Sequence, residues 1–554
     1  MRLVLILGVV VAIGVLAAGS VAAALILRDT GRPPEATAQY IPADVDFYLY
    51  LDLDDVRGDL ASQFLAPFRS EAFESVRDDF LGEIQKEIDL LEGSTSLIGA
   101  DVTVALFAGE NKSVEPDWAV FAQTKGRDAG GTFAERVRET LSEDQGVPFS
   151  QEAYLGADLF VVNDQEPALA VTDEYVIYGV NPARLKATID NLATPPSNSL
   201  AKDEAFLKAT ASLPSDRSAF VFLRNDSPSL GEVFELATLG TVPLGEGSPE
   251  FAAASASFIE RGVRLDLYMD PVEGGLIPTA ENRLLSADRL PEDALMLVSF
   301  VGANEAWQQF RDSGGADDLF GQTNRAGEPE GLAAMIGLSA LDSVMGTLTG
   351  EVALALLPSD IRIDSDGDFE SGVINALLMA ETADASGFEA ILDIALGLFA
   401  PALSMMDPEG PQSFQPTQID IGEYQAKSWD LSGLLGETIN YEPGYLITED
   451  MLVIGSTTDN LRDFNAALTG DTSSLRSNKT FSKALDLAPD PLQFLMYADI
   501  AGIVEMVENA MAPETLVEYT QQVKPIVAPF ESLVVAGSST AEAIRFTLAI
   551  TIKE

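Results

Sequence analysis

Residues 40–55 read YIPADVDFYLYLDLDD, a short turn followed by a run in which two kinds of residue alternate. Proline and aspartate in residues 42–44 are typical of a turn that opens a strand. Successive side chains of a strand point to opposite faces. Tyrosines and aspartates therefore share one face and apolar residues the other: Tyr48, Tyr50, Asp52 and Asp54 against Phe47, Leu49, Leu51 and Leu53. We expect the leucine face to lie against a core and the tyrosine face to be solvated.

Similar stretches return later in the chain in the same order. Their separation grows from 249 to 276 residues along the chain. The four pairs are 41–47 with 290–296, 100–106 with 350–356, 170–179 with 446–455, and 203–214 with 479–489. Because one order is kept throughout, the matches predict an internal duplication.

Each half combines hairpins with amphipathic helices. Thr-Asp-Glu at 172–174 and Thr-Glu-Asp at 448–450 are typical of hairpin tips between apolar strands. Hairpins beside helices favour an α+β fold, with two duplicated domains of largely antiparallel sheet covered by helices. The predicted boundaries are an anchor (1–28), a linker (29–40), a first repeat domain (41–272), a linker (273–289) and a second repeat domain (290–554).

The N-terminal segment predicts the location. Residues 3–27 are uncharged and mostly apolar, and Arg2 and Arg28 flank them. A helix of about 20 residues spans a bilayer core, whereas the apolar part of a cleaved signal peptide has about 7–15 residues. We expect an uncleaved transmembrane signal anchor, with the bulk of the chain extracytoplasmic and the protein single-pass in the cell membrane. The small residues 17–24 leave a cleaved signal peptide as the alternative.

Composition excludes several classes of function. The 554 residues carry 33 Lys+Arg against 87 Asp+Glu, a formal charge of −54, and contain neither His nor Cys. Binding to a phosphate backbone needs clustered cations, so we expect no nucleic-acid partner. Without His and Cys the chain has no Ser-His or Cys-His catalytic pair and no zinc finger or iron–sulfur cluster. We expect no cofactor other than a metal held by oxygen ligands.

One acidic loop resembles half of a calcium site. Carboxylates alternate around Gly367, and the oxygens that would bind the metal belong to Asp364, Asp366, Asp368 and Glu370. The loop departs from the EF-hand pattern, because glycine stands at its fourth position and no glutamate at its twelfth. It lies between predicted strands at 351–357 and 373–379, so a solvated hairpin tip is the alternative to a calcium site.

The first strand offers a second carboxylate pair. Asp52 and Asp54 could serve as the acid and base of a glycosidase, but Val301 and Ala303 take their places in the second half. Asp55 matches Asn304 instead, and each precedes a helical pattern, which predicts that both cap helices. We expect no catalytic residues.

The stretch 387–406 is apolar on more than one helical face. Its counterpart at 132–142 is shorter and carries charged residues. An all-round apolar helix is typically buried in its own protein. A partner surface or an apolar pocket is the alternative.

The spanning N-terminus, the opening at 40–55 and the two similar halves resemble the domain-of-unknown-function 3352 family of prokaryotic proteins. The resemblance implies a membrane-associated protein and supplies no catalytic residues. We therefore expect a non-catalytic binding or scaffolding protein of the bacterial cell envelope, whose partner is an envelope protein or an apolar ligand. The alternatives are a carboxylate- or metal-dependent extracytoplasmic hydrolase and an apolar-ligand carrier.

Overall fold

The structure is a computed structural model with an α+β fold, in which helices cover a large antiparallel sheet. It describes residues 35–52, 59–67, 98–107, 117–145, 149–161, 168–224, 249–271, 281–312, 344–363, 369–383, 387, 389, 416–431 and 441–553. The predicted anchor at residues 3–27 lies outside these ranges. Among the helices that the structure describes, none has the length and apolar character needed to cross a membrane.

The chain divides into two units. The N-terminal unit comprises residues 2–273 and 542–554, and the C-terminal unit comprises residues 274–541. The predicted second repeat domain includes residues 542–554, whereas the contacts of these residues group them with the N-terminal unit. The reason is strand pairing, because Ile544–Ile552 forms a strand beside Gly262–Met269 of the N-terminal unit.

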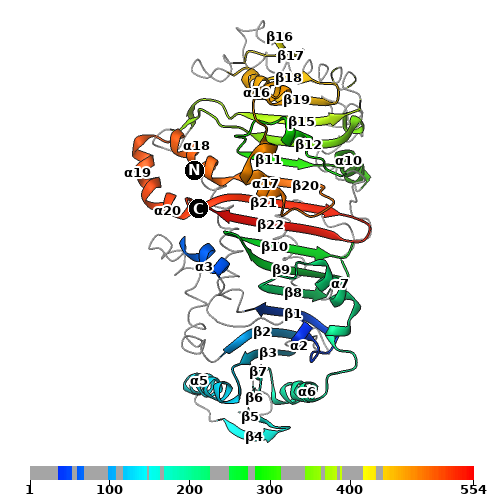
Figure 1. The fold of residues 1–554 in the computed structure, drawn as a ribbon, viewed down its shortest axis with the longest axis vertical. Coiled ribbons are helices and arrows are strands. Elements are labelled where there is room, and N and C mark those ends of the chain that lie inside the picture. The colour runs from blue at the N-terminus through cyan, green and yellow to red at the C-terminus, as the bar shows by residue number, and fades with distance from the viewer. Residues whose placement is uncertain are drawn as a thin grey trace, which may run out of the picture. The chain divides into compact units, whose positions relative to one another are not determined.

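All strand pairs of the N-terminal unit are antiparallel (Figure 1). The order across the sheet is β22–β10–β9–β8–β1–β2–β3–β7–β6–β5–β4. The strands are β1 (Val45–Asp52), β2 (Ile98–Phe107), β3 (Asp117–Thr124), β4 (Ser150–Tyr154), β5 (Ala157–Val161), β6 (Ala168–Val171), β7 (Tyr175–Gly179), β8 (Ala219–Arg224), β9 (Phe251–Ile259), β10 (Gly262–Met269) and β22 (Ile544–Ile552).

Helices cover both faces of this sheet. In Figure 1, α5 and α6 lie on opposite sides of β6 and β7. Gly130 lets α5 approach closely, because a Cβ there would lie 3.2 Å from the Val171 side chain. On the other face, Asn181 caps α6 and Asp203 caps α7 by accepting backbone N–H groups. The helices are α2 (Glu35–Ala38), α3 (Asp59–Leu65), α5 (Arg127–Gln145), α6 (Pro182–Ala193), η4 (Leu200–Lys202) and α7 (Glu204–Ser212).

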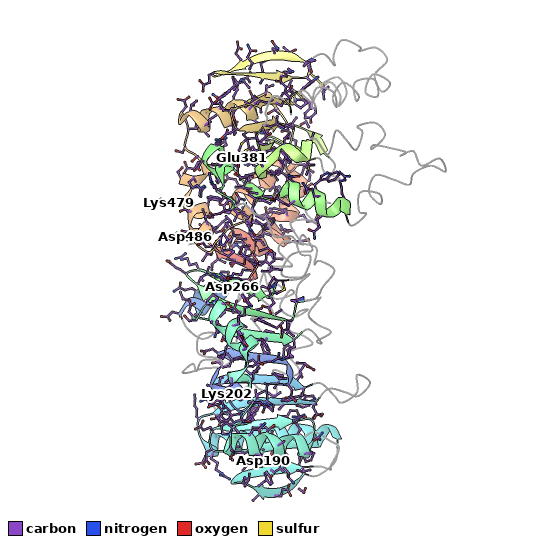
Figure 2. The ribbon with its side chains drawn as sticks, turned by 90° about the vertical axis from the view of Figure 1, so that its right-hand side faces the viewer. Asp190, Lys202, Asp266, Glu381, Lys479 and Asp486 are labelled. Atoms are coloured by element: carbon purple, nitrogen blue, oxygen red, sulfur yellow. The ribbon has the colours of Figure 1, made fainter. Side chains whose placement is uncertain are left out.

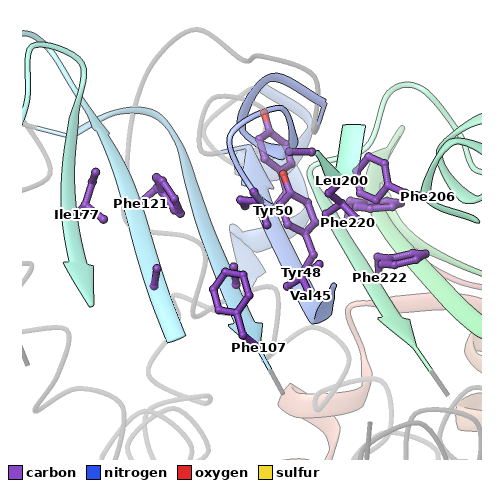
Figure 3. Packing of buried hydrophobic residues seen from close by; sticks show 14 of the residues in the cluster. Val45, Tyr48, Tyr50, Phe107, Phe121, Ile177, Leu200, Phe206, Phe220 and Phe222 are labelled. Atoms are coloured by element: carbon purple, nitrogen blue, oxygen red, sulfur yellow. The ribbon is translucent and has the colours of Figure 1, made fainter. Parts of the chain in front are cut away.

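The tyrosine face of β1 is buried, contrary to the sequence-based expectation. Tyr48 and Tyr50 are 0% and 1% exposed, whereas Leu49 is only half-buried. The Tyr48 ring packs edge-on against Phe206 at 5.5 Å between centroids, as Figure 3 shows. Its hydroxyl lies 2.7 Å from Thr37 Oγ1, so the polar end of the side chain is satisfied inside the core. The tyrosine face of β1 is buried because its rings pack against other aromatic side chains and the Tyr48 hydroxyl has a hydrogen-bond partner.

The C-terminal unit repeats this style of sheet. All its described strand pairs are antiparallel, in the order β21–β20–β11–β12–β15–β19–β18–β17–β16. The strands are β11 (Met296–Phe300), β12 (Leu348–Leu356), β15 (Ala376–Thr382), β16 (Thr417–Ile421), β17 (Tyr424–Ser428), β18 (Gly444–Ile447), β19 (Met451–Gly455), β20 (Phe494–Asp499) and β21 (Phe530–Ser539). A separate short hairpin pairs β13 (Arg362–Ile363) with β14 (Phe369–Ser371).

The helices of the C-terminal unit begin before its first strand. They are α9 (Leu285–Arg289), α10 (Ala303–Asp312), α16 (Thr458–Thr469), η5 (Leu475–Ser477), α17 (Lys479–Leu485), α18 (Ile500–Ala510), α19 (Pro513–Gln522) and α20 (Lys524–Val527). Both predicted linkers thus contain helix, α2 in 29–40 and α9 in 273–289. Thr37 and Ser286 explain this, because each is fully buried and hydrogen-bonded to its own unit.

The predicted cap at Asn304 is wrong. Helix α10 begins at Ala303, so Asn304 is already helical. Its Oδ1 accepts a hydrogen bond from Gln308 Nε2 at 3.0 Å, one turn further along the helix. Its side-chain oxygen therefore pairs with Gln308, inside the helix, and Asn304 is not the N-cap residue. Asp55, the other predicted cap, lies outside the described residues.

Candidate functional site

A buried hydrogen-bond network surrounds one carboxylate in the C-terminal unit. Glu351 on β12 is 2% exposed. Ser286 donates its backbone N–H to Glu351 Oε2 at 3.0 Å and its hydroxyl to Oε1. Ser299 on β11 donates to Oε1 at 2.6 Å, and Asn282 Nδ2 donates in turn to Ser299 Oγ at 2.7 Å. The carboxylate of Glu351 on β12 thereby binds α9 through Ser286 and β11 through Ser299.

Further charges surround this network. The backbone N–H of Glu351 donates to Glu381 Oε2 at 3.2 Å, and Figure 2 labels Glu381 on β15. Gly350 leaves room for this carboxylate, because a Cβ there would overlap it and the Glu381 side chain would have to move. Arg289 forms a two-pronged ion pair with Asp450, at 2.9 and 2.7 Å. This pairing raises the pKa of Arg289 and lowers the pKa of Asp450.

The Glu351 network is a structural anchor. Both carboxylate oxygens accept hydrogen bonds, and the hydroxyl donors Ser286 and Ser299 are each 0% exposed. A general acid or base must come within hydrogen-bond reach of a substrate. Buried polar groups that are fully satisfied stabilise a unique arrangement of the core. Glu351 therefore stabilises the arrangement of α9, β11 and β12.

The opposite face of the same sheet carries an exposed apolar row. We use this name for Met496, Val298, Leu354, Leu378 and Ile454, which lie opposite one another on five neighbouring strands. Leu354 and Leu378 are each 41% exposed although they belong to interior strands of the sheet. The other three are half-buried. Single exposed apolar residues are normal on a protein surface, whereas a contiguous patch marks an interaction site.

The patch has a defined boundary. Ile374, just before β15, is 48% exposed. Toward the other ends of the strands the same face is closed by a cluster of buried residues that includes Ala303, Ala380 and Leu452. Among the described residues, Leu354 and Leu378 are thus the exposed part of this face, and Ile454 packs against the buried cluster at its border.

The N-terminal unit offers a direct comparison. The counterparts by strand register are Val221, Leu49, Val104, Val120 and Tyr178. Each of these five is half-buried, and none reaches the exposure of Leu354 or Leu378. The exposed pair is therefore a property of the C-terminal unit. The sequence does not reveal it, because both faces of β12 and β15 carry apolar residues.

The predicted calcium-site residues lie almost entirely outside the described ranges. Asp364, Asp366 and Asp368 lie outside the described residues, and of Glu370 only the backbone is described, in β14. In the part of the chain that the structure describes, no group of three or more acidic side chains is arranged to hold a metal ion. The apolar stretch 387–406 also lies outside, except for residues 387 and 389.

Comparisons with known proteins give a family and little else. No curated protein matches the chain. Solved structures of TP0453 in crystal forms III and IV are 12% identical and cover 44% of this chain, and 80% and 81% of their own. Their TM-scores of 0.26 and 0.25 are too low to establish a shared fold. The family described as "Protein of unknown function (DUF3352)" matches residues 2–552. Since this match spans nearly the whole sequence, the chain belongs to the DUF3352 family.

Proposed function

We propose that the protein is a non-catalytic binding protein of the cell envelope, and that its C-terminal unit binds an amphipathic helix of a partner protein on the exposed apolar row. The observation that carries this proposal is the adjacent pair Leu354 and Leu378, each 41% exposed on interior strands. Burying a leucine side chain contributes about 1.5–3 kcal/mol, so a partner that covers both gains substantial free energy.

The dimensions of the row favour a helix. Five strands about 4.8 Å apart place its ends ~19 Å from each other. An α-helix rises about 5.4 Å per turn, so three to four turns lie across this distance. Apolar side chains at every third or fourth position would then meet successive strands.

Charge adds a second requirement on the partner. The chain carries a formal charge of −54, so an acidic partner is repelled at low ionic strength. We expect the helix to carry Lys and Arg on its polar face. Such charges raise the association rate and are screened by salt, whereas the apolar contact is not.

Replacing both leucines should remove binding. We expect a labelled 18-residue Leu/Lys amphipathic peptide to bind the wild-type protein in 0.5 M NaCl, measured by fluorescence anisotropy. The Leu354→Gln/Leu378→Gln variant should bind it at least about tenfold more weakly, since the lost apolar contact exceeds 1.4 kcal/mol.

Two controls make this test specific. Val517→Gln removes an apolar side chain that is 58% exposed on α19, and it should leave the affinity unchanged. A peptide of equal charge with Gln at its Leu positions should not bind the wild-type protein. Equal affinity of the wild-type and double-variant proteins for the Leu/Lys peptide would rule out the exposed apolar row as the binding surface.

We also propose that residues 3–27 are a retained anchor that leaves both units outside the cytoplasm. The support is the uncharged apolar run between Arg2 and Arg28. N-terminal sequencing of the protein extracted from membranes should find residues that precede Arg28, and protease added to intact cells should digest both units. A mature N-terminus at Ala24 or later would exclude the anchor.

We further infer that the two units are duplicated copies. Strands β1 to β9 and their counterparts pair in one order, and the hairpin threonines agree. Thr172 Oγ1 donates to Tyr175 O at 3.0 Å, and Thr448 Oγ1 donates to Met451 O at 3.3 Å. Duplication supplies a common framework, and the exposed apolar row is a later difference that assigns binding to the second copy.

A further inference from the structure

The last strand of the chain completes the first unit. β22 pairs with β10 over the whole length of that strand, from Gly262 opposite Thr551 to Met269 opposite Ile544. The pairing continues past the strand, because Ile552 donates its N–H to Arg261 O at 2.8 Å. Asp266 and Thr547, which are neighbours on these two strands, are thus about 280 positions apart in sequence.

Apolar contacts fill one face of this pair. Ile544 and Phe546 of β22 are 8% and 6% exposed. They belong to one cluster with Leu223, Leu267 and Met269 of the N-terminal unit. Strand β22 therefore buries apolar surface of β8, β9 and β10, which come much earlier in the sequence.

A buried polar pair lies on the other face. Asp266 on β10 is 6% exposed, and its Oδ1 accepts a hydrogen bond from Thr547 Oγ1 of β22 at 2.7 Å. Arg264 Nε donates to the same oxygen at 2.9 Å. Burial raises the pKa of the Asp266 carboxyl, which shows that its charge is poorly solvated once β22 is in place.

We propose that the edge of β10 is a strand-acceptor site whose ligand is the C-terminal segment 542–554, bound by its own contacts and not through the chain connection. The register is specified by position 547. A slip by one residue would place an apolar side chain opposite Asp266 and turn the apolar face of β22 outward.

Asp266 also makes the acceptor selective. An inward-pointing charge on an edge strand disfavours pairing with wholly apolar strands. A strand without a hydroxyl at the position of Thr547 leaves the carboxylate buried with one hydrogen bond fewer. The site therefore takes a strand with alternating apolar residues and a hydroxyl at the position of Thr547, as in residues 544–552.

The test uses the full chain with one cleavable peptide bond. Ala541 and Glu542 are both exposed, and the boundary between the units falls between them. A protease recognition sequence inserted there is cut after folding. We expect fragment 542–554 to remain bound during gel filtration, and a fluorescein-labelled synthetic peptide 542–554 in excess to exchange for it, to one peptide per chain.

Variant peptides separate the proposal from general stickiness. Thr547→Val should bind about tenfold more weakly, Thr547→Ser should bind like the native sequence, and a scrambled peptide should not bind. Dissociation of the fragment after cleavage with no rebinding, while far-UV circular dichroism is unchanged, would overturn the proposal. So would equal binding of the Thr547→Val, scrambled and native peptides. Neither result involves Leu354 or Leu378, so a failure of this proposal would leave the proposed function of the exposed apolar row unaffected.

Discussion

Phe206→Ala is expected to lower the free energy of unfolding of the N-terminal unit by about 3–5 kcal/mol. The Phe206 side chain is 0% exposed. Its ring lies edge-on to Tyr48, Phe220 and Phe222, at 5.5, 5.6 and 5.5 Å between centroids. Truncation removes these contacts and leaves a cavity that the rigid sheet cannot close. Urea unfolding followed by hydrogen exchange, resolved by peptide, measures the loss in each unit.

The controls for Phe206→Ala come from the same chain. Leu207 is next in α7 and 46% exposed, so Leu207→Ala should change the stability by less than about 0.5 kcal/mol. Phe481 on α17 is 1% exposed and packs edge-on against Tyr497 at 5.0 Å. Phe481→Ala should destabilise the C-terminal unit comparably. A loss below 1 kcal/mol for Phe206→Ala would contradict the packing described for this core.

Glu351→Ala should destabilise the C-terminal unit by about 2–4 kcal/mol. The substitution leaves the backbone N–H of Ser286 and the hydroxyls of Ser286 and Ser299 without their acceptor in a buried site. Each unsatisfied buried group costs about 1–3 kcal/mol, and partial relaxation lowers the sum. Glu351→Gln keeps the shape but replaces one acceptor by a donor, so an intermediate loss is expected.

A double-mutant cycle tests the network directly. Ser299→Ala combined with Glu351→Ala should show a coupling energy above about 0.5 kcal/mol, because the two side chains share a hydrogen bond of 2.6 Å. Asp459→Ala is the exposed control, since the Asp459 side chain is 81% exposed in its pair with Arg462. Strictly additive losses at Glu351 and Ser299 would mean that the network contributes no cooperative stability.

Local patterns in the sequence predict much of the fold. Alternation around residues 47–53 predicts β1, and the Thr-Asp-Glu tip at 172–174 predicts the β6–β7 hairpin, because register and turn chemistry act between near neighbours. The α+β class follows from these hairpins and helices. Alternation shows which residues share a face but not which face is buried, so the tyrosine side of β1 is predicted wrongly. The outcome depends on Thr37 and Phe206, which arrive from other parts of the chain.

The rest depends on partners distant in sequence. Asn282 and Ser286 lie in a predicted linker, and only the folded chain brings them to Glu351. The exposed apolar row lies on strands with apolar residues on both faces, and the covered face of β12 carries Glu351 and Ala353, so hydropathy does not identify the covered face. The placement of β22 beside β10 likewise follows from no local signal.

Because β22 pairs with β10, strand β10 is synthesised long before its partner strand. Strand β10 ends at Met269 and β22 begins at Ile544. At about 5–20 residues per second, the ribosome needs roughly 15–55 s to cover this distance. Throughout that interval the nascent N-terminal unit exposes an edge strand, the kind of edge on which chains aggregate. Asp266, which lies on that edge, lacks the hydrogen bond from Thr547 until its partner strand emerges. Synthesis of β22 is therefore the event that covers the exposed edge of β10.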